Sequence, residues 1–309
     1  MSGTPAAADP EISVVIPHLN DEERLAACLE SLAAQRLAAA RFEVLVVDNG
    51  SVEPPEDLVA RFPGVRLVTE PTPGPGPARN RGVTLARAPI IAFLDSDCIA
   101  DPGWLPTILA GFGDPDCGIL GGAVRIFAAD PGRPNLAEAF DLVYGIRQEW
   151  TIARHGFAAT ANLAVRREVF EAVGPFAGLE ISEDMEWGMR AKAKGFPTRF
   201  LPGAVMRHPA RTSMADLRRQ WDRHISHHWS MQPKSLRGRA EWLVRAAAMA
   251  ASPLAELPRV VGTDRLPGPR ARLDAFRGVA RMRLYRARRM LAELLDPAGR
   301  QRSARWNRS

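Results

Sequence analysis

Short apolar runs alternate with polar loops and helical spacing along the first hundred residues. Three of these runs are typical of buried strands, because they are short and rich in β-branched residues: Ile12–Pro17, Glu43–Val47 and Ile90–Leu94. Between the first two, apolar residues three and four apart predict a helix: Leu25, Cys28, Leu29 and Leu32. This alternation predicts an α/β fold with a mixed, mostly parallel, Rossmann-like sheet flanked by helices.

Polar side chains follow each of these strands. Asn20 lies just after the first, Asp48 follows the second, and Asp95 and Asp97 follow the third. The carboxyl ends of parallel strands share one edge of a sheet, where ligands of open α/β sheets bind. Mg²⁺ and Mn²⁺ prefer oxygen ligands, so the acidic pair predicts a divalent cation that holds a diphosphate. Taken alone, such a pair is equally typical of a helix cap or a turn.

A loop rich in glycine and proline, Pro73–Gly82, is predicted to open a further helix. The helix start offers free N–H groups, and Arg79 and Arg81 add positive charge, which suits an anion. The segment is neither a G-x-G-x-x-G fingerprint nor a Walker loop, so it indicates neither NAD nor a P-loop nucleotide.

An acidic helix start is the main feature of the second half. Ser182 is a good N-cap residue, and Glu183 and Asp184 occupy the first turn, where the helix dipole favours negative charge. Upstream, a short helix is expected over Glu168–Val173, and downstream a strand over Thr198–Pro202.

Five motifs in this order resemble family 2 glycosyltransferases with the GT-A fold, over Ile12 to about Trp229. The resemblance implies an inverting transfer of a sugar from a nucleotide-sugar donor, with a UDP-sugar favoured, to a hydroxyl acceptor, with Mg²⁺ or Mn²⁺. It rests on Val15-Ile16-Pro17 with Asn20, Val46-Val47-Asp48-Asn49-Gly50-Ser51, Ala78-Arg79-Asn80-Arg81-Gly82, Phe93-Leu94-Asp95-Ser96-Asp97, and Glu183-Asp184.

The resemblance also implies roles on the donor side. Asp48 would bind the donor's base, and the segment from Pro17 to Asn20 would line the nucleotide pocket. Arg79 would lie near the base or the phosphates. Asp97 would ligate the metal, and Asp95 would contact the ribose or a metal-bound water. A simple turn at Asp48 and a surface position for Arg79 are the alternatives.

On the acceptor side, the resemblance implies that Asp184 is the general base and that Glu183 orients the acceptor, although the two roles could be exchanged. Asn162 would lie in a stretch beside the donor sugar and the acceptor. Trp187 would offer a flat face to a sugar, but a core position is favoured because Met185 and Met189 share its helical spacing. His208 would complete the metal shell, with an ordinary loop histidine as the alternative.

Composition favours a cytoplasmic protein. With 309 residues and 46% hydrophobic content, the chain can bury a large core. Its three cysteines have no paired spacing, which indicates a reducing compartment. Residues 1–10 are predicted to be disordered and lack the pattern of a signal peptide, and the apolar stretch Trp242–Val261 is interrupted by charges and prolines. His224, His227 and His228 have no cysteine partner nearby, so they do not indicate zinc.

Positive charge is concentrated at the C-terminus. Residues 237–309 hold 17 arginines and six acidic residues, a net charge of +11, whereas the rest of the chain carries −5. We therefore predict a catalytic domain over 11–236 and a basic helical extension over 237–309. A helix within it has arginine flanks and an apolar stripe, which suits either an anionic membrane surface or packing on the catalytic domain. The stripe comprises Leu273, Phe276, Ala280, Leu284, Ala287, Leu291 and Leu294.

Membrane contact would bring the donor to a saccharide or lipid-linked acceptor, in the synthesis of a surface polysaccharide or glycolipid on the inner face of the membrane. Nucleic acid is not an expected partner, because few aromatic residues accompany the arginines and no reading motif is present. The alternative functions are a non-catalytic scaffold at the membrane and a sugar-nucleotide pyrophosphorylase. The second would need a glycine-rich loop with a basic pair after the first strand, where Pro17 to Asn20 stands instead.

Overall fold

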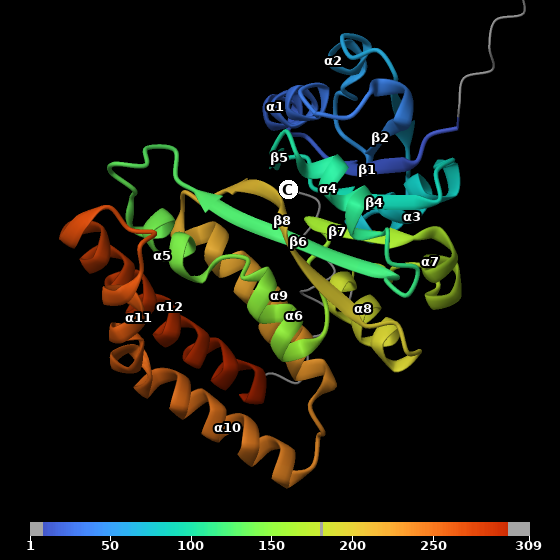
Figure 1. The fold of residues 1–309 in the computed structure, drawn as a ribbon. Helices are drawn as coiled ribbons and strands as arrows, with labels where there is room; N and C mark the ends of the chain where they lie inside the picture. Colours follow the sequence, from blue (N-terminus) through green and yellow to red (C-terminus); the bar gives the residue numbers. More distant parts are fainter. Residues whose placement is uncertain (1–8, 180–181, 296–309) are drawn as a thin grey trace, which may run out of the picture. The chain divides into compact units, whose positions relative to one another are not determined.

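A computed structural model describes residues 9–179 and 182–295 and divides them into two compact units (Figure 1). The first unit contains residues up to 125 together with 146–208, and the second contains 126–145 and the residues after 208. The disorder predicted for residues 1–10 falls outside the described residues, apart from positions 9 and 10.

A mixed eight-stranded sheet forms the centre of the first unit. Strand β1 lies between β2 and β4 and is parallel to both, and β2 is also parallel to β3. The pairs β4–β7, β7–β6 and β5–β8 are antiparallel. The strands, in the spatial order β3-β2-β1-β4-β7-β6-β8-β5, are β1 (Ile12–His18), β2 (Phe42–Asp48), β3 (Val65–Thr69), β4 (Ile90–Leu94), β5 (Ile99–Ala100), β6 (Ile119–Phe127), β7 (Asn162–Arg166) and β8 (Thr198–Pro209). The mixed sheet predicted from the sequence is confirmed, and all four predicted strands are present, the last of them as the longer β8.

Helices of the first unit connect and cover these strands. Asp21 caps the first of them by accepting a hydrogen bond from the Arg24 amide, and the four apolar residues predicted for this helix are its buried face. The helices are α1 (Glu22–Ala33), η1 (Ala39–Arg41), α2 (Glu56–Ala60), α3 (Pro75–Leu85), α4 (Trp104–Gly111), α6 (Gln148–His155), α7 (Arg167–Val173) and α8 (Glu183–Ala193).

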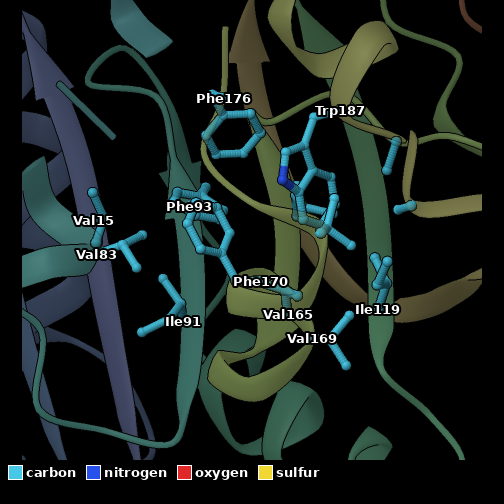
Figure 2. Packing of buried hydrophobic residues seen from close by; sticks show 14 of the residues in the cluster. Val15, Val83, Ile91, Phe93, Ile119, Val165, Val169, Phe170, Phe176 and Trp187 are labelled. Carbon is cyan, nitrogen blue, oxygen red and sulfur yellow. The ribbon is translucent and has the colours of Figure 1, made fainter. Parts of the chain in front are cut away.

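Aromatic packing fixes α7 and α8 to the sheet. Phe93 of β4 meets the ring of Phe176 edge-on, with 5.2 Å between ring centroids, and Phe170 of α7 stacks on Trp187 of α8 at 5.7 Å (Figure 2). Such pairs contribute about 0.5–1.5 kcal/mol each beyond the burial of their surface. The start of α8 is therefore held close to the end of β4.

Gly82 lets α3 lie directly on β1. A Cβ atom at this position would come 2.2 Å from Cγ1 of Val15, a distance that no side chain tolerates. Because the helix and the strand touch at this point, the face of α3 that carries Arg79 points into the unit, and Arg79 is only 3% exposed.

The second unit is helical. It contains α5 (Leu136–Tyr144), α9 (Met214–Met231), α10 (Leu236–Ala251), η2 (Pro253–Glu256), α11 (Leu257–Gly262) and α12 (Gly268–Leu295). The long helix α12 packs against α5, α9 and α10. The sequence predicted that a catalytic domain ends at residue 236 and a basic extension begins at residue 237, and this boundary stays a prediction. The packing groups α9, which lies before that boundary, with the helices that follow it.

The apolar stripe expected on α12 coincides only in part with the face that packs: Ala287 is buried, and Phe276 and Leu294 pack against buried clusters. Leu273, Leu284 and Leu291 are exposed, and the buried face is made largely of small residues and methionines. Small residues allow closer helix contact than leucines do: a Cβ atom on Gly278 would lie 2.9 Å from the Cβ of Phe140. The buried face comprises Ala271, Ala275, Gly278, Val279, Met282, Ala287, Met290 and Glu293.

None of the helices within 9–179 and 182–295 combines the length and the apolar character needed to cross a bilayer.

We expect Gly82→Ala to lower the free energy of unfolding by about 1–3 kcal/mol, because overpacking forces α3 and β1 apart. Urea unfolding followed by circular dichroism measures the change. Gly178→Ala is the matched control, since a Cβ atom at Gly178 meets nothing within 4 Å and its φ is not positive. Equal stabilities of the two variants would show that α3 does not depend on this contact.

Candidate functional site

Polar side chains collect at the carboxyl ends of β1, β2 and β4, as predicted. His18 is the last residue of β1 and lies opposite Asp48, the last residue of β2. Asp95 follows β4, which neighbours β1 on its other side. The parallel register of these strands is the reason why residues distant in sequence share one edge of the sheet.

Asp48 has one satisfied and one unsatisfied oxygen. Oδ2 accepts hydrogen bonds from the amides of Gly50 and Ser51, both at 3.2 Å, and this turn uses the positive φ of Gly50. Oδ1 is buried and has no hydrogen-bond partner among the described residues, and the same holds for Nδ1 of neighbouring His18. A buried acceptor without a donor is costly, so this pair suits a ligand that brings N–H or O–H groups.

Asn20 is bonded to the turn that follows Asp48. It is the one non-glycine residue with positive φ among the described residues, and its Oδ1 accepts the amide of Val52 at 2.9 Å. Its own amide donates to Oγ of Ser51. Pro17 precedes it in β1, opposite Val47 of β2. The structure thus brings Pro17 and Asn20 next to Asp48, as the sequence predicted.

Arg79 forms the central contact of the site. Its Nη2 lies 2.6 Å from Oδ1 of Asp95, and its Nη1 lies 2.8 Å from Oε1 of Glu183. Burial alone would lower the pKa of Arg79, but the charges of Asp95 and Glu183 outweigh it and raise the pKa. The guanidinium therefore has two carboxylate partners and is buried, so the alternative of a surface position is wrong, while its place near the donor base or phosphates stays a prediction.

Asp97 and His208 come together because β5 pairs with β8. The register places Ile99 opposite Arg207, so the residues just before β5 face His208. Nε2 of His208 lies 3.5 Å from Oδ2 of Asp97. Cys98 joins them: the ligand atoms of Asp97, Cys98 and His208 all lie within 4.8 Å of one another.

This cluster fits a divalent cation. Asp97 is the most exposed of its three residues, its side chain retaining 26% of its accessible surface, and it offers a hard oxygen ligand beside an imidazole nitrogen. In the described part of the chain, no other group of three histidines, cysteines or acids has this geometry, so His224, His227 and His228 do not make a metal site. Sequence reasoning missed Cys98, because only the pairing of β5 with β8 brings it next to His208.

Asp184 lies in the first turn of α8, next to the Arg79 ion pair. Its pKa is raised to about 7, first by burial of the carboxyl group and then by the charge of Glu183. The hydrogen bond from the Met185 amide and the charge of Arg79 act in the opposite direction. Ser182 occupies the N-cap position, but its side chain makes no capping hydrogen bond, in contrast to the sequence prediction.

Two predicted acceptor-binding residues are instead parts of the core. Asn162 is 1% exposed, accepts the Trp104 indole N–H at 2.9 Å, and donates to the carbonyls of Ala123 and Ala204. Trp187 is also 1% exposed, and its Nε1 donates to the Gly174 carbonyl at 2.8 Å. Asn162 has no free polar atom, and Trp187 has no open ring face. We therefore do not retain either side chain as an acceptor contact.

Comparison with known proteins places these features in a family. The chain matches the family model described as Glycosyl transferase family 2 over residues 13–174. It is 32% identical over 218 residues to glycosyltransferase AglE of Haloferax volcanii, covering 69% of this chain and 71% of that protein. It is 30% identical over 216 residues to a pre-mycofactocin glycosyltransferase of Mycobacterium tuberculosis, covering 67% of this chain but only 44% of that protein.

Solved structures share the fold at low sequence identity. The mannosyltransferase PcManGT of Pyrobaculum calidifontis, in complex with GDP-Man and Mn²⁺, matches with a TM-score of 0.62 and 17% identity, over 96% of this chain and 90% of that one. TarS 1-349 of S. aureus, in complex with UDP-GlcNAc, matches with a TM-score of 0.53 and 16% identity, over 88% of this chain and 90% of that one. At this identity, the likeness shows the fold alone.

We expect the charge on Asp184 to make the protein less stable as pH rises. Its pKa in the folded state, about 7, exceeds the ordinary value of 3.8, so the folded protein binds this proton more tightly than the unfolded chain does. Stability from this group is therefore fully present below pH 4 and is lost between about pH 4 and pH 7. Asp184→Asn should remove this loss and gain stability, relative to the natural chain, on going from pH 5 to pH 8.

Chemical denaturation at a series of pH values, in metal-free buffer, measures the effect. Glu171→Gln, which neutralises an exposed carboxylate of α7, is the control and should leave the pH profile unchanged. Parallel profiles for the natural chain and Asp184→Asn would contradict the raised pKa of Asp184.

Proposed function

This chain belongs to glycosyl transferase family 2, as its five motifs predicted, and we propose that it transfers a sugar, with inversion, from a nucleotide-sugar donor to a hydroxyl acceptor. The observation that carries the proposal is the double ion pair of Arg79. It holds the acidic segment after β4, which suits a cation and a diphosphate, beside the acidic start of α8, which suits a base.

The donor side of the proposal rests on Asp48 and Asp97. The unpaired Oδ1 of Asp48 would accept an N–H group of the donor's base. Uracil and guanine both offer such a group, so this contact alone does not select between them. A UDP-sugar remains our first choice, and the GDP-Man and UDP-GlcNAc complexes of the fold neighbours make GDP the second nucleotide to test.

A divalent cation, Mn²⁺ or Mg²⁺, would be held by Asp97 and His208, with Asp95 reaching the ribose or a metal-bound water. Such a cation would supply a fixed positive charge that stabilises the leaving nucleoside diphosphate. Cys98 lies beside these ligands, but burial raises the pKa of its thiol, so the proposed ligands are Asp97 and His208 alone.

Asp184 would act as the general base. A base works best when its pKa lies near the working pH, and the pKa of about 7 meets this condition. Its carboxylate would take the proton of the acceptor hydroxyl as that oxygen attacks the anomeric carbon from the side opposite to the diphosphate, and this attack inverts the configuration. Glu183, fixed by Arg79, would position the acceptor. A saccharide or lipid-linked acceptor of a surface polysaccharide or glycolipid remains the expected class.

We expect UDP or GDP with Mn²⁺ to raise the melting temperature by several degrees, since a ligand at a hundred times its Kd stabilises by about 2.7 kcal/mol. Asp97→Ala should abolish the part of the shift that requires Mn²⁺. Asp101→Ala, which removes an acid just after β5 and outside the metal cluster, should keep it. Thermal melts with each nucleotide, with and without Mn²⁺, make the comparison. Equal loss in both variants would remove Asp97 from the proposed metal shell.

Asp184→Asn should bind the donor nucleotide as the natural chain does and should transfer sugar at least about 100-fold more slowly, because general-base catalysis is lost. Calorimetric binding of the nucleotide and release of nucleoside diphosphate in the presence of acceptor measure the two properties separately. Transfer at the natural rate would show that Asp184 is not the base, and Glu183→Gln would then be the next variant to test.

A further inference from the structure

The outer side of α10 is apolar and exposed. Leu243 keeps 51% of its surface and Val244 keeps 67%. The opposite side of the same helix is buried in the second unit, where Nε1 of Trp242 donates to the Met290 carbonyl at 2.8 Å. The helix thus has apolar residues on two sides: the side with Trp242 packs inside the second unit, and the side with Leu243 and Val244 is exposed. Its exposed apolar positions, which share one face at helical spacing, are Leu236, Ala240, Leu243, Val244, Ala247 and Ala251.

The apolar surface continues into the next two elements. Leu254 of η2 is 70% exposed, and Leu257 and Val261 of α11 are 38% and 63% exposed. α10 contacts η2, and η2 contacts α11, so these side chains belong to one continuous part of the second unit. We call this surface, formed by the exposed apolar residues between positions 236 and 261, the α10–α11 face. Soluble proteins rarely expose apolar surface over consecutive elements unless something binds there.

Arginines border the α10–α11 face. Arg237 and Arg239 lie on the two edges of the apolar side of α10, and Arg259 lies between Leu257 and Val261 in the sequence. Arg237 and Arg259 pair with Glu241 and Glu256, but their side chains stay 91% and 45% exposed. Over the whole second unit, 23 basic residues stand against 11 acidic ones, a net charge of +12, whereas the first unit carries −6. An apolar face with a cationic border matches the surface of an anionic bilayer.

The basic helix α12, which on its sequence suited either a membrane or the catalytic domain, has several arginines that interact inside the second unit. Arg289 pairs with Asp222 and Glu293, both at 2.9 Å, and Arg286 lies over the Trp221 ring at 3.5 Å. Arg283 pairs with Glu256. These arginines hold α12 to the rest of the unit and are less available to lipid.

We propose that this chain binds an anionic lipid bilayer through the α10–α11 face, with Leu243, Val244 and Leu254 entering the boundary between headgroups and acyl chains. A second copy of the chain is the less favourable occupant, because a symmetric contact through this face would bring two arginine borders together. The proposal does not depend on sugar transfer, and it places the lipid contact on a different helix from α12.

Cosedimentation of the full chain with vesicles tests the proposal. The natural chain should bind vesicles of phosphatidylcholine with phosphatidylglycerol, bind pure phosphatidylcholine more weakly, and lose affinity as salt is added. The triple change Leu243→Gln, Val244→Gln and Leu254→Gln should weaken binding at least tenfold. The matched triple change Leu273→Gln, Leu284→Gln and Leu291→Gln, on the exposed leucines of α12, should leave it unchanged.

The proposal would be wrong if the natural chain did not bind anionic vesicles, or if both triple variants lost binding equally. It would also be wrong if light scattering showed a dimer of the natural chain, and the first triple change dissociated this dimer without weakening vesicle binding. If the first triple variant unfolds, Arg237→Ala decides, since it should lower binding to anionic vesicles at least threefold and leave the melting temperature unchanged. Stabilisation by nucleotide and Mn²⁺ reports on the first unit, whereas vesicle binding reports on the second. A failure to bind vesicles would therefore leave the proposed sugar transfer untouched, and the reverse also holds.

Discussion

The candidate site depends on one buried side chain, the positively charged guanidinium of Arg79. Arg79 is 3% exposed and ion-paired with Asp95, 16 residues away in sequence, and with Glu183, 104 residues away. A guanidinium is tolerated in such a place only when carboxylates neutralise it, and removing a partner from a buried pair costs about 3–5 kcal/mol. The same bonds that satisfy Arg79 therefore fix the two carboxylates. In this way the end of β4 and the start of α8 become one site.

The two proposed roles, metal ligand for Asp97 and general base for Asp184, require carboxyl groups with different properties. Asp97 needs an open, ionised carboxylate for a cation, and it is partly exposed beside His208. Asp184 needs a carboxyl group that can take up a proton near neutral pH, and burial together with the charge of Glu183 raises its pKa. Arg79 moderates this rise because its charge acts in the opposite direction. The environment of each acid, rather than its residue type, separates the proposed metal ligand from the proposed base.

The sequence predicted the strands and the acids at their ends because both are local signals: a short apolar run, followed by a polar residue. It could not predict the partners of Arg79, since a contact across 104 residues depends on how α8 packs through Phe170 and Trp187. The position of Cys98 beside His208 depends on the β5–β8 register, which leaves no sequence signal. On α12, Leu273, Leu284 and Leu291 were predicted to share the apolar stripe but are exposed, because close helix contact favoured small residues such as Gly278.

Hydrogen exchange of Arg79→Met tests most directly whether this residue joins the two halves of the site. If it does, amides in two separate segments, 90–98 and 183–190, will exchange faster than in the natural chain, while β3, on the far edge of the sheet, keeps its protection. Unchanged exchange in both segments, or a change confined to α3, would show that the end of β4 and the start of α8 are held independently of Arg79.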